Sequence, residues 1–154
     1  MPAYGAAVDV DVPPTDAFAY VADLTRHGEW SADPLDIRLV DGAAGVIGSH
    51  YEATAKAQGK TITARLEVTE AEAPSRLGFR VSDLTGDYEH VFTFTETGSG
   101  TRLDRRIKTS QLSLPQLLLF YLVFFPVKLP NAKRAMTRLK THLEEASRPE
   151  PARG

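Results

Sequence analysis

The chain has 154 residues, of which 42% are hydrophobic and 25% are charged, and its formal net charge is −2. These values are typical of one globular domain with its own core, and the slightly acidic balance gives no electrostatic basis for nucleic-acid binding. The lack of cysteine excludes disulfides, thiolate metal sites and a cysteine nucleophile. The first ten residues lack the basic and apolar regions of a signal peptide, so we expect a cytoplasmic protein.

The N-terminal region predicts one strand and two short helices. Residues 8–12 alternate valine with aspartate, which is typical of a half-buried strand. Pro13 and Pro14 should end that strand, because proline cannot donate to a ladder. We expect Thr15 to cap a first helix and Asp23 to cap a second one that leads to Trp30.

The middle of the chain predicts six further strands joined by short turns. Their expected ranges are 35–40, 50–57, 61–70, 77–81, 88–95 and 101–109. Short connections predict an antiparallel sheet, and one apolar face predicts a cover on that side. The helix expected over Asn131–Ala146 carries an apolar stripe and is the natural cover. The fold class is therefore α+β. We expect one domain over residues 1–148 and a disordered tail over 149–154.

The chain resembles the SRPBCC superfamily, the START/Bet v 1-like helix-grip proteins, and most closely its polyketide cyclase/dehydrase-like branch. The likeness rests on the Val8–Val10 strand and the segments Glu67–Val81 and Gly100–Arg102, on the C-terminal helix, and on Pro13, Phe18, Val21, Asp23, His27 and Trp30. It implies a curved seven-stranded sheet wrapped around the long helix, with a ligand cavity between them. It implies little about reaction, because one fold hosts many functions.

Polar residues in register with apolar ones on the last strands are the candidate site residues. Arg105 shares a strand face with Leu103, His90 and Tyr88 share one with Phe92, and Asp83 lies on the strand before. Burial of such groups costs free energy unless they are paired or functional. Because these strands are sequential neighbours, the polar side chains could meet in one place. The full set of expected ligand-binding residues is Arg105, His90, Tyr88, Asp83, Tyr51, Phe92, Leu103, Phe120 and Phe124.

Each polar candidate has a structural alternative. Arg105 could hold a ligand carboxylate or phenolate, or it could pair with Asp83, or a bulge could turn it to solvent. His90 could act as an acid or base near neutral pH, or be a structural histidine at the mouth of the sheet. His27 and Trp30 are expected to pack the short helices against the sheet. No histidine or carboxylate spacing predicts a metal site, and we expect no cofactor.

The segment from Thr109 to Val127 contains no charged residue, and Leu117–Phe125 is continuously apolar. It is shorter than the roughly 20 apolar residues of a membrane span and is bounded by Pro115 and Pro126. Two interpretations stay open. The segment could be a buried start of the C-terminal helix, with a kink at Pro126 and Pro130. Alternatively, it could be a lid or an exposed patch for a greasy ligand, a membrane surface or a homodimer partner.

Three functions are compatible with these features. The first is binding of a lipid-, polyketide- or isoprenoid-like molecule in an internal cavity. The second is a cyclase/aromatase-type enzyme without metal or nucleotide, in which His90 and Arg105 would be catalytic. The third is an interaction or membrane-surface protein that docks through residues 117–125. The few interior polar residues favour the first function.

Overall fold

The computed structural model describes residues 3–57, 59–84, 86–109 and 113–147, apart from the side chains of Ala57, Phe120, Phe124 and Ser147. Its strands form one antiparallel sheet in the order β1-β7-β6-β5-β4-β3-β2. The strand bounds are β1 Ala3–Val10, β2 Leu35–Asp41, β3 His50–Ala57, β4 Lys60–Glu72, β5 Arg76–Asp83, β6 Gly86–Glu96 and β7 Thr101–Thr109. The predicted seven-stranded antiparallel sheet is therefore confirmed.

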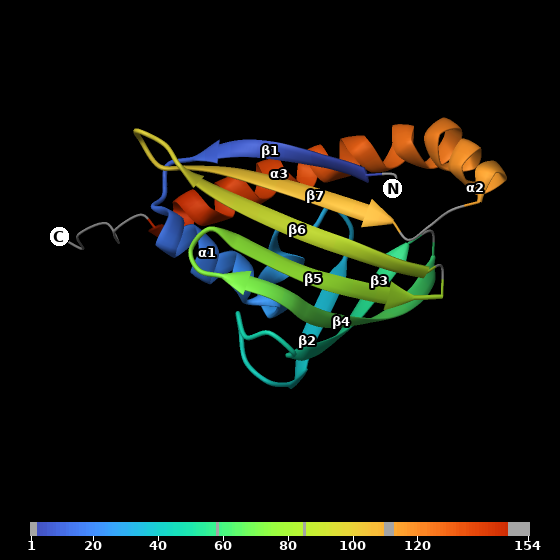
Figure 1. The fold of residues 1–154 in the computed structure, drawn as a ribbon, viewed down its shortest axis with the longest axis horizontal. Helices are drawn as coiled ribbons and strands as arrows, with labels where there is room; N and C mark the ends of the chain where they lie inside the picture. Colours follow the sequence, from blue (N-terminus) through green and yellow to red (C-terminus); the bar gives the residue numbers. More distant parts are fainter. Residues whose placement is uncertain (1–2, 58, 85, 110–112, 148–154) are drawn as a thin grey trace.

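The helices are α1 Pro14–Ala22, the 3₁₀ helix η1 Leu24–Glu29, α2 Leu114–Leu119, the π-helix η2 Phe120–Phe124 and α3 Phe125–Ser147. Figure 1 shows α3 running along β1, with α1 near the C-terminal end of α3 and α2 beyond the opposite end of the sheet. Lys140 Nζ fixes α3 to β1 by donating to the Asp9 carbonyl oxygen at 2.6 Å. This is the α+β helix-grip arrangement that the resemblance implied.

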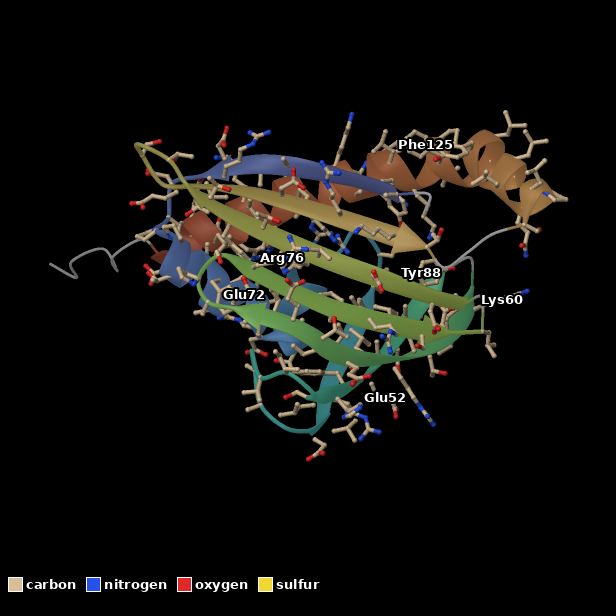
Figure 2. The ribbon with its side chains drawn as sticks, viewed as in Figure 1. Glu52, Lys60, Glu72, Arg76, Tyr88 and Phe125 are labelled. Carbon is tan, nitrogen blue, oxygen red and sulfur yellow. The ribbon has the colours of Figure 1, made fainter. Side chains whose placement is uncertain are left out.

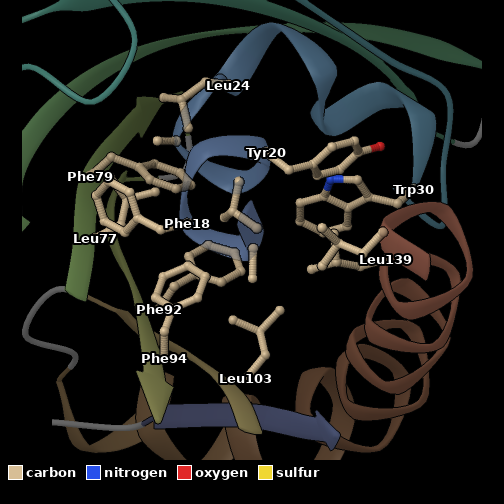
Figure 3. Close-up of a cluster of buried hydrophobic side chains, with 14 of the residues drawn as sticks. Phe18, Tyr20, Leu24, Trp30, Leu77, Phe79, Phe92, Phe94, Leu103 and Leu139 are labelled. Atoms are coloured by element: carbon tan, nitrogen blue, oxygen red, sulfur yellow. The ribbon is translucent and has the colours of Figure 1, made fainter. Parts of the chain in front are cut away.

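The core lies between the sheet and the helices. Figure 3 shows Trp30 and Leu139 on the helical side of this core and Phe92 and Leu103 on the sheet side. Alternation explains the sheet side, because every second residue of a strand points to the same face. The largest fully buried side chains are those of Trp30, Tyr51, Phe92, Leu24, Leu77, Leu103, Met136, Leu139, Leu143, Val12, Val21 and Val68.

Three local predictions are wrong. The first strand begins at Ala3 rather than Val8, because Ala3–Ala7 continue the pairing with β7. Thr15 does not cap α1: Pro13 occupies the N-cap position and Pro14 the first helical position, where its fixed φ suits a helix start. The long helix begins at Phe125, not Asn131, and runs through Pro130.

The cap predicted for the second short helix is confirmed. Asp23 is the N-cap of η1, and its carboxylate accepts from the Thr25 backbone N–H at 3.2 Å and from the Thr25 hydroxyl at 2.5 Å. This cap fixes the turn that carries His27 and Trp30 into the core. The expected tail, residues 149–154, lies outside the described part of the chain.

Candidate functional site

Arg105 lies in the middle of β7 with its side chain on the inner face of the sheet. It is paired with Ala6 of β1 on one side and Phe92 of β6 on the other, in an unbroken register. Its neighbours in alternation, Leu103 and Ile107, are buried. The alternative in which a bulge turns Arg105 to solvent is therefore wrong.

The Arg105 guanidinium lies among aromatic rings rather than beside an acid. Its central carbon is 5.3 Å from the ring centre of Trp30 and 5.5 Å from that of Phe92, which are cation–π distances. Among the described residues no carboxylate lies within 4.0 Å of it, and its Nε is buried without a hydrogen-bond partner. Burial lowers the pKa of Arg105 to about 10, so the group remains a cation at neutral pH.

The alternative in which Arg105 forms an ion pair with Asp83 does not hold. Arg105 on β7 is paired with Phe92 on β6, and Phe92 is paired with Leu77 on β5. Asp83 lies at the end of β5, opposite Gly86 and six residues after Leu77. At about 3.3 Å per residue this separation is roughly 20 Å along the strand. Asp83 is therefore also too far away to share a ligand group with Arg105.

His90 contacts Arg105 directly across the two neighbouring strands. Arg105 Nη2 donates to His90 Nδ1 at 3.2 Å, because a guanidinium has no acceptor. The His90 proton consequently sits on Nε2, and the ring stacks on Phe79 with centres 4.9 Å apart. Burial, followed by the nearby Arg105 and His27, holds the pKa of His90 well below its usual value. This environment favours the alternative in which His90 is a structural histidine over the one in which it is an acid or base near neutral pH.

His27 and Trp30 close the site from the helical side. His27 Nε2 donates to the Val21 carbonyl oxygen at 2.7 Å, and burial lowers the pKa of His27 to about 4. The His27 ring is 4.7 Å from Trp30 and 5.7 Å from Phe79, centre to centre. The two residues thus pack the short helices on the sheet as expected. Trp30 has a further role, because its ring covers Arg105 while its own Nε1 lacks a partner among the described residues.

Tyr4 belongs to the same cluster and was missed by the sequence analysis. It is paired with Ile107 on the inner face of the sheet, and Ile107 is two residues after Arg105 on β7. Burial raises the pKa of its hydroxyl, and the charge of Arg105 opposes that shift. The alternation of Tyr4 with Ala6 and Val8 could have indicated it, but this stretch was not included in the predicted strand.

Some of the other predicted residues belong to a second group of polar side chains, called the second polar row, and the rest belong to the core. Tyr51, Tyr88 and Thr109 lie in one row across the inner face, two residues along the strands from that of His90. Tyr51 Oη and Thr109 Oγ1 are buried without hydrogen-bond partners among the described residues. Figure 2 shows Tyr88 near the end of β6 that faces α2. Phe92 and Leu103 are fully buried core.

The predicted role of Phe120 and Phe124 concerns side chains that lie outside the described part of the structure. A hollow of about 230 Å³ lies over β1 and β7, and most of its lining belongs to the outer face of the sheet, where Gly5 pairs with Arg106 and Ala7 with Asp104. It therefore does not mark the space between the sheet and α3. Among the described residues, no cluster of His, Asp and Glu has the arrangement of a metal site.

The model of the family described as "Polyketide cyclase / dehydrase and lipid transport" matches residues 1–144. Comparison with curated proteins gives no match. The match covers the whole of the sheet and nearly all of α3, and it agrees with a fold that binds hydrophobic ligands.

Several solved structures share the fold at low sequence identity. TTHA0849 from Thermus thermophilus is 20% identical with a TM-score of 0.76, over 96% of this chain and 100% of that one. The Bet v 1 homologue Ara h 8.0201 is 16% identical with a TM-score of 0.68, over 94% and 98%. CV1439 from Chromobacterium violaceum is 14% identical with a TM-score of 0.68, over 94% and 99%. Identities this low carry the fold and nothing finer.

Proposed function

Because the chain belongs to the polyketide cyclase/dehydrase and lipid transport family, we propose that it binds an apolar molecule between the sheet and α3 and holds an oxygen of that molecule with Arg105 and Trp30. One observation carries this proposal. Arg105 Nε and Trp30 Nε1 are buried N–H groups without hydrogen-bond partners among the described residues, and the Arg105 guanidinium carbon lies 5.3 Å from the centre of the Trp30 ring.

Both groups can only donate, so they specify the chemistry of their partner. A buried donor without an acceptor loses the hydrogen bonds that it makes to water in the unfolded chain. A buried cation without an anion adds a larger cost. A ligand carboxylate, phenolate or enolate would satisfy the two donors and the charge together.

The second polar row suggests more than one ligand oxygen. Tyr51 Oη and Thr109 Oγ1 are buried and lack partners among the described residues, and aromatic and aliphatic side chains lie between their row and Arg105. A simple fatty acid offers polar atoms at one end only, whereas an oxygenated polyketide-like skeleton offers them at several points. The distribution of unpartnered groups therefore favours an oxygen-rich ligand.

A cyclase-type reaction is the second candidate, and the environment of His90 supports it less well. An acid/base catalyst needs an available lone pair or an exchangeable proton at working pH. The Nδ1 lone pair of His90 already accepts from Arg105, and its low pKa keeps the ring neutral. Arg105 could still stabilise an enolate, but the titratable groups beside it have pKa values shifted away from neutral pH, downward for His90 and upward for Tyr4.

Paired probes test the binding proposal. Laurate and dodecanol have the same chain length and differ in the charge of the headgroup. Trp30 is the only tryptophan, so its fluorescence reports binding close to Arg105. Arg105→Met should weaken laurate at least about 10-fold and change dodecanol little, since one charge-assisted pair is worth about 1.5–3 kcal/mol.

Arg106→Met is the matched control, because Arg106 is the next residue of β7 and its side chain is 70% exposed. It should leave both affinities unchanged. Equal losses of laurate and dodecanol in Arg105→Met would contradict an anion-binding role. If wild-type protein bound neither probe nor an aromatic acid such as 2-naphthoate, the binding function itself would be wrong.

A further inference from the structure

The apolar segment, defined as residues 114–127, is exposed although it contains no charged residue. Leu114 is 84% exposed, Leu118 62% and Leu122 68%. Figure 2 shows apolar side chains projecting from α2 and from the start of α3 near Phe125, away from the sheet. Leu117 and Phe125 are partly buried, but the other described side chains at positions 114–127 are exposed. The interpretation in which the described part of the chain buries this segment is therefore wrong for most of its described side chains, which need an apolar environment from elsewhere.

The exposed side chains surround the helix rather than form one stripe. Leu114 and Leu118 form one line along α2 at a spacing of four residues. Leu119 lies about 100° around the helix from Leu118 and starts a second line. The exposure continues over Leu122 and Val123 of the π-helix η2 and over Val127 at the start of α3. A second protein would cover one of these lines and leave the other in water. A lipid phase covers both, and a helix that is apolar all round requires such an environment.

The charges beside the segment complement an anionic surface. The sequence from Arg105 to Leu143 contains eight lysines and arginines and no acidic residue. Lys128 follows the segment directly, and Lys133 and Arg134 lie about one and a half turns later on exposed positions of α3. Cations next to an apolar helix are attracted to anionic headgroups while the apolar side chains enter the acyl region.

The length of the segment suits one leaflet. Leu114–Val123 would extend about 15 Å, half of the roughly 30 Å hydrocarbon core. No single described helix is long and apolar enough to cross a membrane, and Leu114–Val123 is bent by 56° from Phe125–Ala146. We propose that the apolar segment inserts into one leaflet of a bilayer with anionic headgroups, with Lys128, Lys133 and Arg134 at the headgroup level. This proposal does not depend on the ligand site.

Vesicle flotation of the full chain tests it. Wild-type protein should float with phosphatidylglycerol/phosphatidylcholine vesicles, and more weakly with pure phosphatidylcholine. Leu118→Ser with Leu122→Ser should reduce the bound fraction at least 10-fold without unfolding, because both side chains are already exposed. The matched control is Val46→Ser with Ile47→Ser, two exposed apolar residues of the β2–β3 connection (51% and 61%), which should float like wild type.

Charge reversal tests the attraction to anionic headgroups separately from the insertion of the apolar side chains. Lys128→Glu with Lys133→Glu should lower binding to anionic vesicles several-fold and abolish the preference over neutral ones. The proposal is overturned if wild-type protein does not float, or if both serine pairs float equally. It is also overturned if sedimentation without vesicles gives a dimer that Leu118→Ser with Leu122→Ser dissociates, because the occupant would then be a second copy.

Discussion

Arg105 Nη2 and His90 Nδ1 are 3.2 Å apart, joined diagonally across β7 and β6 in the middle of the sheet. A buried arginine usually pairs with a carboxylate, whereas here its polar partner is a neutral ring that carries no compensating charge. The pair orients the guanidinium and leaves Nε available. This geometry is suited to holding an anion that the protein itself does not provide.

Arg105→Met should keep or raise the stability of the ligand-free protein. An uncompensated buried cation opposes folding, and replacement of buried charges by apolar residues of similar size is often neutral or stabilising by about 1–4 kcal/mol. We expect urea unfolding of Arg105→Met to give an unchanged or higher free energy of unfolding. Arg106→Met, on the outer face, should unfold like wild type. A loss above about 2 kcal/mol would show that Arg105 is mainly structural.

Trp30→Phe should reduce ligand affinity more than its packing cost explains. The substitution keeps a ring over Arg105 but removes the unpartnered Nε1 donor. We expect calorimetric laurate affinity to fall about 10-fold or more, since one hydrogen bond to a charged group is worth about 1.5–3 kcal/mol. Phe94→Leu is the control. It also removes a buried aromatic ring, which packs on Phe18, and it should leave the laurate affinity unchanged. Equal losses in both variants would point to a general effect of core packing.

The alternation of polar and apolar residues was sufficient to predict the strands and the face of the sheet on which the Arg105 side chain lies. His50–Ala57 and Thr101–Thr109 match the observed bounds because each is a regular run ended by turn residues. Side-chain direction in a strand has a period of two, so Leu103 and Ile107 determine the face of Arg105 without tertiary information. The same logic correctly placed His90 with Phe92.

Properties that depend on distant parts of the chain were not predictable. The low pKa of His90 arises from burial and from Arg105 on another strand. Tyr4 was missed because its stretch, Ala3–Ala7, has little polar contrast and is strand only through pairing with β7. The exposure of Leu118 depends on where α2 lies relative to the sheet, and no local pattern encodes that position.

His27 should make the protein lose stability in acid. Its pKa is about 4 when folded and about 6.5 when unfolded, so between these values the unfolded chain binds a proton that the folded chain does not. Stability should therefore be unaffected by His27 above pH 6.5, fall as pH drops toward 4, and fall no further below that. At about 1.4 kcal/mol per pH unit over this interval, the loss approaches about 3.5 kcal/mol. His90 acts in the same direction.

Urea unfolding of His27→Gln between pH 7 and pH 4 measures this contribution. Glutamine can still donate to the Val21 carbonyl but does not titrate, so its stability should decline less steeply than that of wild type. His50→Gln, at an exposed position of β3, should follow the wild-type curve. Parallel curves for wild type and His27→Gln would mean that His27 is not the source of the acid sensitivity.

Gly5→Ala should disrupt the site from the edge of the sheet. A Cβ on Gly5 would overlap the Arg105 carbonyl oxygen, and this oxygen belongs to the backbone and cannot rotate away. β1 must then shift from β7, which displaces Tyr4 from its place beside Arg105. We expect a loss of stability of about 1–3 kcal/mol, typical of overpacking, together with weaker laurate binding. Gly98→Ala, where nothing lies within 4 Å, should change neither property. If Gly5→Ala lowered stability without affecting laurate, the geometry of β1 would not matter for the ligand.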